Sequence, residues 1–284
     1  LEGNRAVGVE GQFIHPASRS KGAKFSVRAR KAVVMAASVT WSPTLLMRSG
    51  IKLPAMGHNF RAHPGTGVLG VYEDEVQMNT GATQGWASMK FRENPGLKLE
   101  TLALPLELVA SRLSGGGADL MTRIREFGHL AHWVMAIRAE AVGRVRAGRF
   151  GGHPVVSYGF GKPDMIRLRQ GMHTVARMHF AAGAKACITG VYGMPYKTGP
   201  DEVDSILQAS LDPRHWTAIL SHLFGGCVMG SDPSRSVCNG RGEVHGIDGL
   251  VMADASQIPT TLGVNPQHTI MSLARLRAHQ LLEN

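Results

Sequence analysis

The sequence has few cysteines and lacks the long apolar runs of membrane-spanning helices. Its 284 residues include three cysteines, Cys187, Cys227 and Cys238, whose spacing matches neither a metal site nor a disulfide framework. No apolar run reaches the roughly 18–20 residues that a spanning helix needs, and there are no internal repeats or low-complexity segments. We therefore expect no metal centre, and we expect a cytoplasmic or peripherally membrane-associated protein.

The composition is that of a folded protein with a basic surface. Hydrophobic residues make up 43% of the chain, and 35 glycines indicate many tight turns or close backbone approaches. The net charge of +10 is consistent with attraction to nucleic acid or an anionic membrane, or with a solvated basic surface. The basic residues are dispersed and form no run interleaved with aromatics. This pattern favours the solvated surface, and we expect no nucleic-acid partner.

The first segment has the pattern of an α/β unit. The apolar run KAVVMAA at 31–37 predicts a strand buried on both faces. It leads into SVTWSPTLLMRSG, for which we predict a short helix. Ser42 is suited to capping that helix, Pro43 to its first turn, and Gly50 to the position just past its end.

The middle of the chain predicts an antiparallel sheet with insertions. Between 68 and 158, short β-like runs such as ETLALPLELVA and HWVMAIRAE alternate with turn residues and one helical stretch near 117–131. An amphipathic helix follows, which we expect Asp164 to cap and Gly183 to end. The last quarter of the chain again has an α/β pattern. It predicts a short strand and then a helix that has Asn265 at its cap and Pro266 at its first position.

Four segments form an ordered set of motifs. They are VVMAASVTWSPTLLMRSG (33–50), LPAMGHNFRAHP (53–64), SHLFGGCVMG (221–230) and GEVHGIDGLVMADASQIPTTLGVNPQHTIMSLA (242–274). This set resembles the glucose–methanol–choline (GMC) oxidoreductases and spans essentially the whole chain. The amino-acid sequences of the last two segments most resemble those of the long-chain (fatty) alcohol oxidase branch of that family.

The resemblance implies a mixed α/β fold with two parts. A flavin-binding α/β domain would comprise residues 1–67 and 206–284. Residues 68–205 would form a substrate domain built on an antiparallel sheet covered by helices. The family's N-terminal GxGxxG unit, which binds the ADP moiety, has no counterpart here. We therefore expect a fragment whose missing part lies upstream and which is inactive in isolation.

Two residues are predicted to be catalytic. His222 precedes a glycine pair and matches the family's active-site histidine. Its imidazole titrates near neutrality, so it can take the proton from an alcohol. Asn265 has an ordinary interpretation as a helix cap. The resemblance also makes it the second member of the catalytic pair, with an amide that binds the substrate oxygen.

The resemblance also implies FAD as the cofactor. The residues expected to bind it are Ala37, Ser38, Asp254, Ala255, Asn265, Pro266, His268 and Thr269. Ser38 stands where the family often has glycine. Asp254 has an alternative role as a turn cap, and His268 and Thr269 are expected to act through their backbone amides. His63 is interpreted as structural and Cys227 as a small packing residue.

The implied function is FAD-dependent oxidation of an alcohol to an aldehyde or ketone. Oxygen or another acceptor would take the electrons, and the branch suggests a long-chain primary alcohol. The Met- and Leu-rich run at 100–124 is either an apolar access path for such a substrate or an ordinary core. Two other functions stay open, which are a lyase of the same family, such as a hydroxynitrile lyase, and a non-catalytic basic binding protein.

Overall fold

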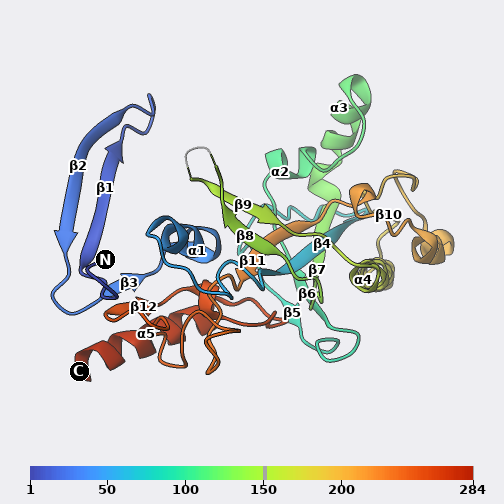
Figure 1. Ribbon diagram of the computed structural model, residues 1–284. Coiled ribbons are helices and arrows are strands. Elements are labelled where there is room, and N and C mark those ends of the chain that lie inside the picture. Colours follow the sequence, from blue (N-terminus) through green and yellow to red (C-terminus); the bar gives the residue numbers. More distant parts are fainter. Residues whose placement is uncertain (150–151, 284) are drawn as a thin grey trace.

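A large antiparallel sheet lies at the centre of the molecule (Figure 1). The computed structural model describes residues 1–149 and 152–283. In spatial order the strands of the sheet are β10 (Ala186–Ile188), β4 (Arg61–Val71), β7 (Leu130–Ile137), β6 (Leu97–Thr101) and β5 (Ala87–Ser88). β11 (Ile219–Phe224) pairs with the first half of β4, on the edge whose second half pairs with β10. The predicted antiparallel sheet is therefore confirmed, and it includes a strand from the last quarter of the chain.

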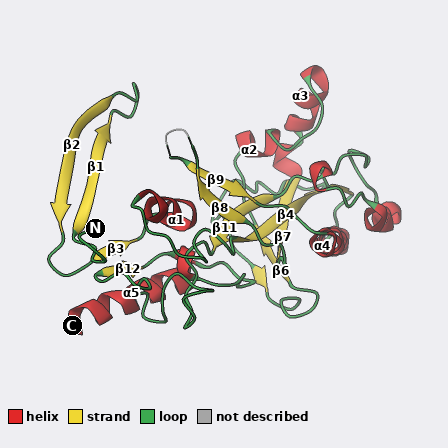
Figure 2. Cartoon of the chain, in the orientation of Figure 1, coloured by secondary structure: helices red, strands yellow, loops and turns green. Residues whose placement is uncertain are grey.

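Helices lie beside the sheet and around the C-terminal region (Figure 2). They are α1 (Ser38–Arg48), α2 (Leu106–Ala110), α3 (Gly117–Arg125), α4 (Lys162–Ala181) and α5 (Gln267–Glu283). Short 3-10 helices are η1 (Phe127–His129), η2 (Pro200–Gln208), η3 (Pro213–His215) and η4 (Ala255–Gln257). α2 corrects the β-like interpretation of ETLALPLELVA, because its second half is helical. Pro105 precedes α2, and leucine, glutamate and alanine favour a helix once no partner strand is available.

α4 covers one face of the sheet. Strands alternate their side chains between two faces, so Val68, Leu99 and Met135 share the face that packs on Leu168 and Met172 of α4. All five side chains are buried. This core covers one face of the sheet and leaves the opposite face for other contacts.

The predicted cap of α4 is wrong, although the helix itself is confirmed. Asp164 lies inside the first turn, and Gly161 is the N-cap. The Asp164 carboxylate accepts hydrogen bonds from the backbone amides of Glu140 (2.8 Å) and Ala141 (3.1 Å). It therefore ties the helix to the segment after β7. Gly183 follows the helix with φ +93°, as a helix end requires.

The α/β region is built on two parallel strands. β3 (Val33–Met35) pairs with β12 (Leu250–Met252) in register. The prediction that this segment is buried on both faces is wrong, since Val34 is 47% exposed. The part of the chain that the structure describes pairs β3 with β12 alone and leaves one of its faces open. Parallel sheets are normally covered on both faces.

α1 begins earlier than predicted. Ser42, expected at the cap, is fully buried inside the helix, and Pro43 is also internal. The Ser42 hydroxyl donates to a carboxylate oxygen of Asp254 at 2.5 Å, so a tertiary contact fixes its place. Gly50 has φ +81° and follows the end of the helix, as predicted.

Smaller features complete the fold. β1 (Gly8–Ile14) and β2 (Lys21–Arg28) form a hairpin that projects from the body, and β8 (Arg144–Ala147) pairs with β9 (Pro154–Ser157) (Figure 1). The three cysteines are free and fully buried, with Cys187 in the core under α4 and the other two beside β12. Within the described residues, no helix has the length and apolar character needed to cross a bilayer.

Candidate functional site

The register of β11 against β4 places His222 directly opposite His63. The two Nδ1 atoms lie 3.1 Å apart, within hydrogen-bond distance. The rings stack with centroids 5.3 Å apart and planes at 22°. His63 is 1% exposed, whereas His222 is only partly buried. Each histidine therefore fixes the orientation of the other, and His222 retains its Nε2 for a further partner.

Both imidazoles are biased toward the neutral form. Burial, followed by the charges of His222 and Lys98, lowers the pKa of His63 to about 4. Burial also lowers the pKa of His222, and the Lys98 charge acts in the same direction, whereas Glu100 opposes both. At neutral pH His222 is accordingly a neutral imidazole, the form that can accept a proton.

Lys98 and Glu100 lie on the same face of the sheet as the two histidines. Lys98 is opposite Ala136 of β7, and Ala136 is opposite Gly65 of β4, two residues from His63. Directly paired residues share a face, as do residues two apart on one strand. Gly65 and Ala136, which lie between Lys98 and the histidine pair, carry no side chain larger than a methyl group.

A buried ion pair reaches from this sheet to Asn265. The Lys98 ammonium contacts a carboxylate oxygen of Glu100, and their side chains are 8% and 10% exposed. The same ammonium donates to Oδ1 of Asn265 at 2.7 Å. Lys98 thus connects the sheet face to the segment that precedes α5.

The structure places Asn265 just ahead of α5 and gives its side chain a different partner from the one predicted. The first intrahelical bond runs from the amide of Ile270 to the carbonyl of Pro266. The cap position therefore falls on Pro266, one residue later than expected. The side-chain oxygen of Asn265 contacts Lys98 and not a helix amide. His268 and Thr269 lie in the first turn of α5, as predicted.

Asp254 organises the carboxyl ends of the parallel strands. One of its oxygens accepts from the Ser38 amide (2.9 Å) and the Ser42 hydroxyl, and the other accepts from the amide and hydroxyl of Ser256. Its role at the start of η4 agrees with the turn-cap interpretation. The carboxylate is occupied by these four donors, so Asp254 shapes this edge by holding neighbouring backbone in place.

Ser38 has an unusual backbone conformation. Its φ is +86°, in the region that favours glycine. Ser38 lies at the start of α1, where its amide bonds Asp254 and its side chain is exposed. Ala37 precedes it and is partly buried. This backbone conformation explains why the family often has glycine where this chain has Ser38.

The glycine pair after His222 joins the sheet to the strand-end region. Gly225 and Gly226 have φ of +78° and +92°. A Cβ on Gly225 would lie 1.9 Å from the Asn59 carbonyl, so no side chain fits there. The Gly225 amide bonds the Ala255 carbonyl at 3.3 Å, beside Asp254. The pair thus brings the His222 strand alongside Ala255 through backbone contacts.

An apolar cluster fixes the elements that carry the site. Val39 of α1, Phe224 of β11 and Ala255 are buried together, with Ile270 and Leu273 of α5 packed against them. The sequence-predicted residues therefore form two groups. Asn265 contacts Lys98, which shares a sheet face with His222, whereas Ser38, Asp254 and Ala255 meet at the strand ends.

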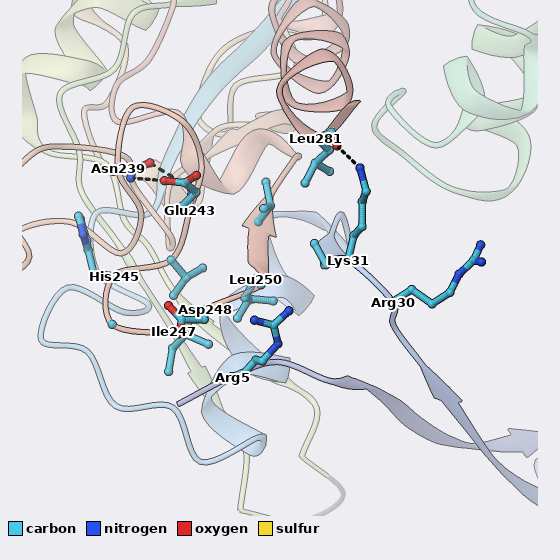
Figure 3. A pocket seen from close by; sticks show the side chains of 15 residues that line it. Arg5, Arg30, Lys31, Asn239, Glu243, His245, Ile247, Asp248, Leu250 and Leu281 are labelled. Carbon is cyan, nitrogen blue, oxygen red and sulfur yellow. Dashed lines mark hydrogen bonds between the residues drawn. The ribbon is translucent and has the colours of Figure 1, made fainter. Parts of the chain in front are cut away.

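A large open pocket lies elsewhere (Figure 3). Its volume is about 640 Å³, and its lining includes Arg5, Arg30 and Lys31. Arg30 and Lys31 precede β3, and Gly249 precedes β12, so the pocket is at the amino ends of the parallel pair. Ligands of parallel α/β sheets bind at the carboxyl ends. We therefore do not assign the candidate site to this pocket.

Three residues of the site were not predicted from the sequence. His63 was interpreted as structural, and Lys98 and Glu100 were not singled out. The alternation in LKLET placed both charges on one strand face, opposite Leu97 and Leu99. Such a pattern usually means a solvated face, and only the fold shows that this face is covered.

Residues 1–65 match the family model of the N-terminal part of GMC oxidoreductases, and residues 140–274 match the model of the C-terminal part. An uncharacterised GMC-type oxidoreductase of Mycobacterium tuberculosis is 32% identical over 95% of this chain and 44% of its own length. A long-chain-alcohol oxidase of Arabidopsis thaliana is 28% identical over 98% of this chain and 38% of its own length. The chain thus spans less than half the length of these relatives.

Solved structures share the fold. Pyridoxine 4-oxidase from Mesorbium loti superposes with a TM-score of 0.74 at 19% identity, over 100% of this chain and 56% of that one. Formate oxidase from Aspergillus oryzae gives 0.71 at 17% identity, over 98% and 57%. The predicted mixed α/β fold with its antiparallel sheet is confirmed. On these matches to both parts of its sequence, the chain belongs to the GMC oxidoreductase family.

Proposed function

We propose that the protein containing this chain oxidises an alcohol with FAD, and that His222 is the base. One observation carries the proposal. A neutral, partly buried imidazole, held at Nδ1 by His63, shares a sheet face with a lysine that contacts Asn265. This arrangement brings a proton acceptor and an amide to the same part of the fold.

The strand-end residues fit a flavin. Ala37 and Ala255 are small, and Asp254 holds the backbone around them through its four donors. The first amides of α5, including those of His268 and Thr269, have no intrahelical acceptor, because a helix leaves its first amides free. Such amides favour a group that carries negative charge. A flavin bound there would supply the acceptor for the hydride of the carbinol carbon, so that an alcohol would leave as an aldehyde or ketone, with oxygen or another acceptor taking the electrons.

The chain's own residues handle the proton and the orientation. The Nε2 of His222 accepts the hydroxyl proton, a step to which a positioned base contributes about 10²–10⁴-fold. For Nε2 to accept the proton, the hydrogen of the neutral His222 ring must lie on Nδ1. This N–H then donates a hydrogen bond to the Nδ1 of His63. The amide of Asn265 donates to the substrate oxygen and holds it near His222.

The substrate proposal rests on the family. The Arabidopsis relatives are named long-chain-alcohol oxidases, and we propose a primary alcohol of that kind with oxygen as acceptor. The run at 100–124 contains Leu104, Val109 and Leu113, which are buried against Leu69 and Leu130. We also retain, as a proposal, the division into a flavin domain (1–67 and 206–284) and a substrate domain (68–205).

The test is anaerobic flavin reduction in the full-length protein. Mixing the purified yellow protein with a long-chain primary alcohol should bleach the flavin, and His222→Gln should slow bleaching by about 10²–10⁴-fold while FAD stays bound. Cyanide release from a cyanohydrin without bleaching would favour the lyase. Salt-dependent DNA binding by a protein that holds no flavin would favour the basic binding protein.

A further inference from the structure

Lys98 contacts two partners in the buried part of the site. It pairs with Glu100 two residues along β6, and it donates to Oδ1 of Asn265 across a separation of 167 residues. We propose that Lys98 is a positioning residue that fixes the orientation of the Asn265 side-chain amide, so that its Nδ2 hydrogens face the substrate. The inference rests on the proposed function, in which Asn265 binds the substrate oxygen.

The chemistry of the two groups dictates the orientation. An asparagine amide has an acceptor on one side and two donors on the other, and it can flip. A lysine ammonium has donors only, so it must face the amide oxygen. At 2.7 Å this hydrogen bond is charge-assisted and stronger than one between neutral groups. In the flipped orientation the NH2 group of Asn265 would face the ammonium, and two donors cannot hydrogen-bond each other. Nδ2 therefore points away from Lys98.

The position of the lysine supports a functional role. A buried ion pair is weak evidence for stability, because the desolvation of both charges offsets their attraction. The Lys98 and Glu100 side chains are about nine-tenths buried, and the sheet has an apolar core on its other face. Glu100 neutralises and holds the ammonium, and the ammonium holds the amide. In the described residues, no other side chain bonds Oδ1 of Asn265.

Lys98 also carries a charge near His222, which gives a competing explanation. If the charge alone mattered, removing Lys98 would slow the reaction whether or not Asn265 were present. If Lys98 acts through Asn265, the two losses should not add. A double-mutant cycle separates the two explanations, because residues that act as a unit are non-additive.

The experiment uses the full-length flavoprotein. Lys98→Met combined with Glu100→Gln removes both charges and avoids leaving a buried carboxylate alone. It should slow flavin reduction by about tenfold, as expected for one misoriented hydrogen bond, and act mainly on kcat. Adding it to Asn265→Ala should cause no further loss. Lys98→Arg, which keeps a charged donor, should recover most of the rate.

A matched control lies just beyond the paired ends of β4 and β10. Lys185→Met with Glu73→Gln removes an exposed ion pair, 67% and 79% exposed, and should leave the rate unchanged. Additive losses in the cycle, or no recovery in Lys98→Arg, would overturn the proposal. A loss in the control equal to that in the Lys98 variant would do the same.

A second readout does not depend on turnover. In protein labelled with ¹⁵N at asparagine, the Asn265 amide signal is identified by its loss in Asn265→Ala. That signal should move in the Lys98 and Glu100 double variant and stay in place in the Lys185 control, without cofactor or substrate. An unmoved signal overturns the positioning role. If the wild type fails to reduce flavin but the signal moves, the proposed function fails and the contact stands.

Discussion

Two imidazoles that share one hydrogen bond limit each other's chemistry. Between the Nδ1 atoms of His63 and His222 only one hydrogen can lie, so one ring donates and the other accepts. A base at Nε2 of His222 requires His63 to be the acceptor. The pKa of His63, lowered to about 4, keeps it neutral and able to accept. Its own hydrogen would then lie on Nε2, a buried atom with no partner among the described residues.

His63→Phe tests this arrangement. Phenylalanine keeps a ring to stack on His222, removes the Nδ1 acceptor and removes the unpartnered Nε2. We expect flavin reduction to slow by roughly tenfold, the equivalent of about 1.4 kcal/mol. The melting temperature should change little, because the variant removes the unpartnered Nε2 of His63 but also leaves the Nδ1 hydrogen of His222 without its acceptor. Wild-type reduction rates in His63→Phe would show that His222 needs no acceptor at Nδ1.

Local motifs predict His222 and Asn265 as site residues, whereas neighbours that are placed only by the fold carry no such signal in the sequence. His222 and Asn265 stand in recognisable segments. His63 acquires its neighbour through the β11–β4 register, across 159 residues, and Lys98 meets Asn265 across 167. No local pattern contains these separations. The first follows from strand pairing and the second from the placement of the segment before α5 against the sheet, and amino-acid spacing alone determines neither.

At the scale of elements, the start of α1 combines backbone strain with a tertiary anchor. Ser38 adopts φ +86° because its amide bonds Asp254 at the end of β12. A non-glycine residue in this region costs about 1–3 kcal/mol. The contacts of its hydroxyl are long, at 3.4 Å to Thr40 and to the Trp41 amide, so they offset little of that cost.

Ser38→Gly should therefore stabilise the protein. Relief of strain outweighs the greater freedom of glycine in the unfolded chain, and we expect a gain of about 0.5–1 kcal/mol. Urea unfolding of the full-length protein measures it. Ser38→Ala is the control, because alanine keeps the strain and loses the hydroxyl, and it should give no gain. Equal midpoints for all three proteins would contradict the strain argument.

The elements themselves were largely predictable, whereas their ends were not. α4, α5, β3, β4, β7 and β9 overlap the predicted segments, whereas β11 was not predicted as a strand and β6 lies mostly before the predicted run at 100–110. The caps failed for a shared reason, since the side chains of Asp164, Ser42 and Asn265 each bond a distant segment. Their local contacts, from Arg167 to Asp164 and from the Ala37 amide to Ser42, do not cap the helix starts as predicted. A polar side chain near a helix start satisfies either kind of partner, and only tertiary structure decides between them.

At the scale of the whole molecule, three buried histidines link folding to pH. Burial lowers the pKa of His63 and of His179 to about 4 and that of His132 to about 3. The unfolded chain therefore binds more protons than the folded one as pH falls below about 6.5. The stability that the neutral imidazoles contribute is present above that value and is lost as pH falls toward 4.

We expect the free energy of unfolding to drop between pH 6.5 and 4, by up to roughly 1.4 kcal/mol per pH unit for each histidine. Urea titrations of the full-length protein at pH 7, 6 and 5 measure this slope. His132→Gln removes one of the three groups and should make the slope shallower. A slope of the same steepness in that variant would mean that His132 does not contribute.

The buried cysteines have a practical consequence. Burial raises the pKa of Cys187 and Cys238 to about 12 and that of Cys227 well above its usual value, and all three are fully inaccessible. A thiol reagent reacts with the exposed thiolate, so each cysteine is labelled only when its surroundings open. Cys187 lies in the core under α4, and Cys227 and Cys238 lie beside β12. The order in which a maleimide labels them therefore reports which of the two cores opens first, with no engineered probe.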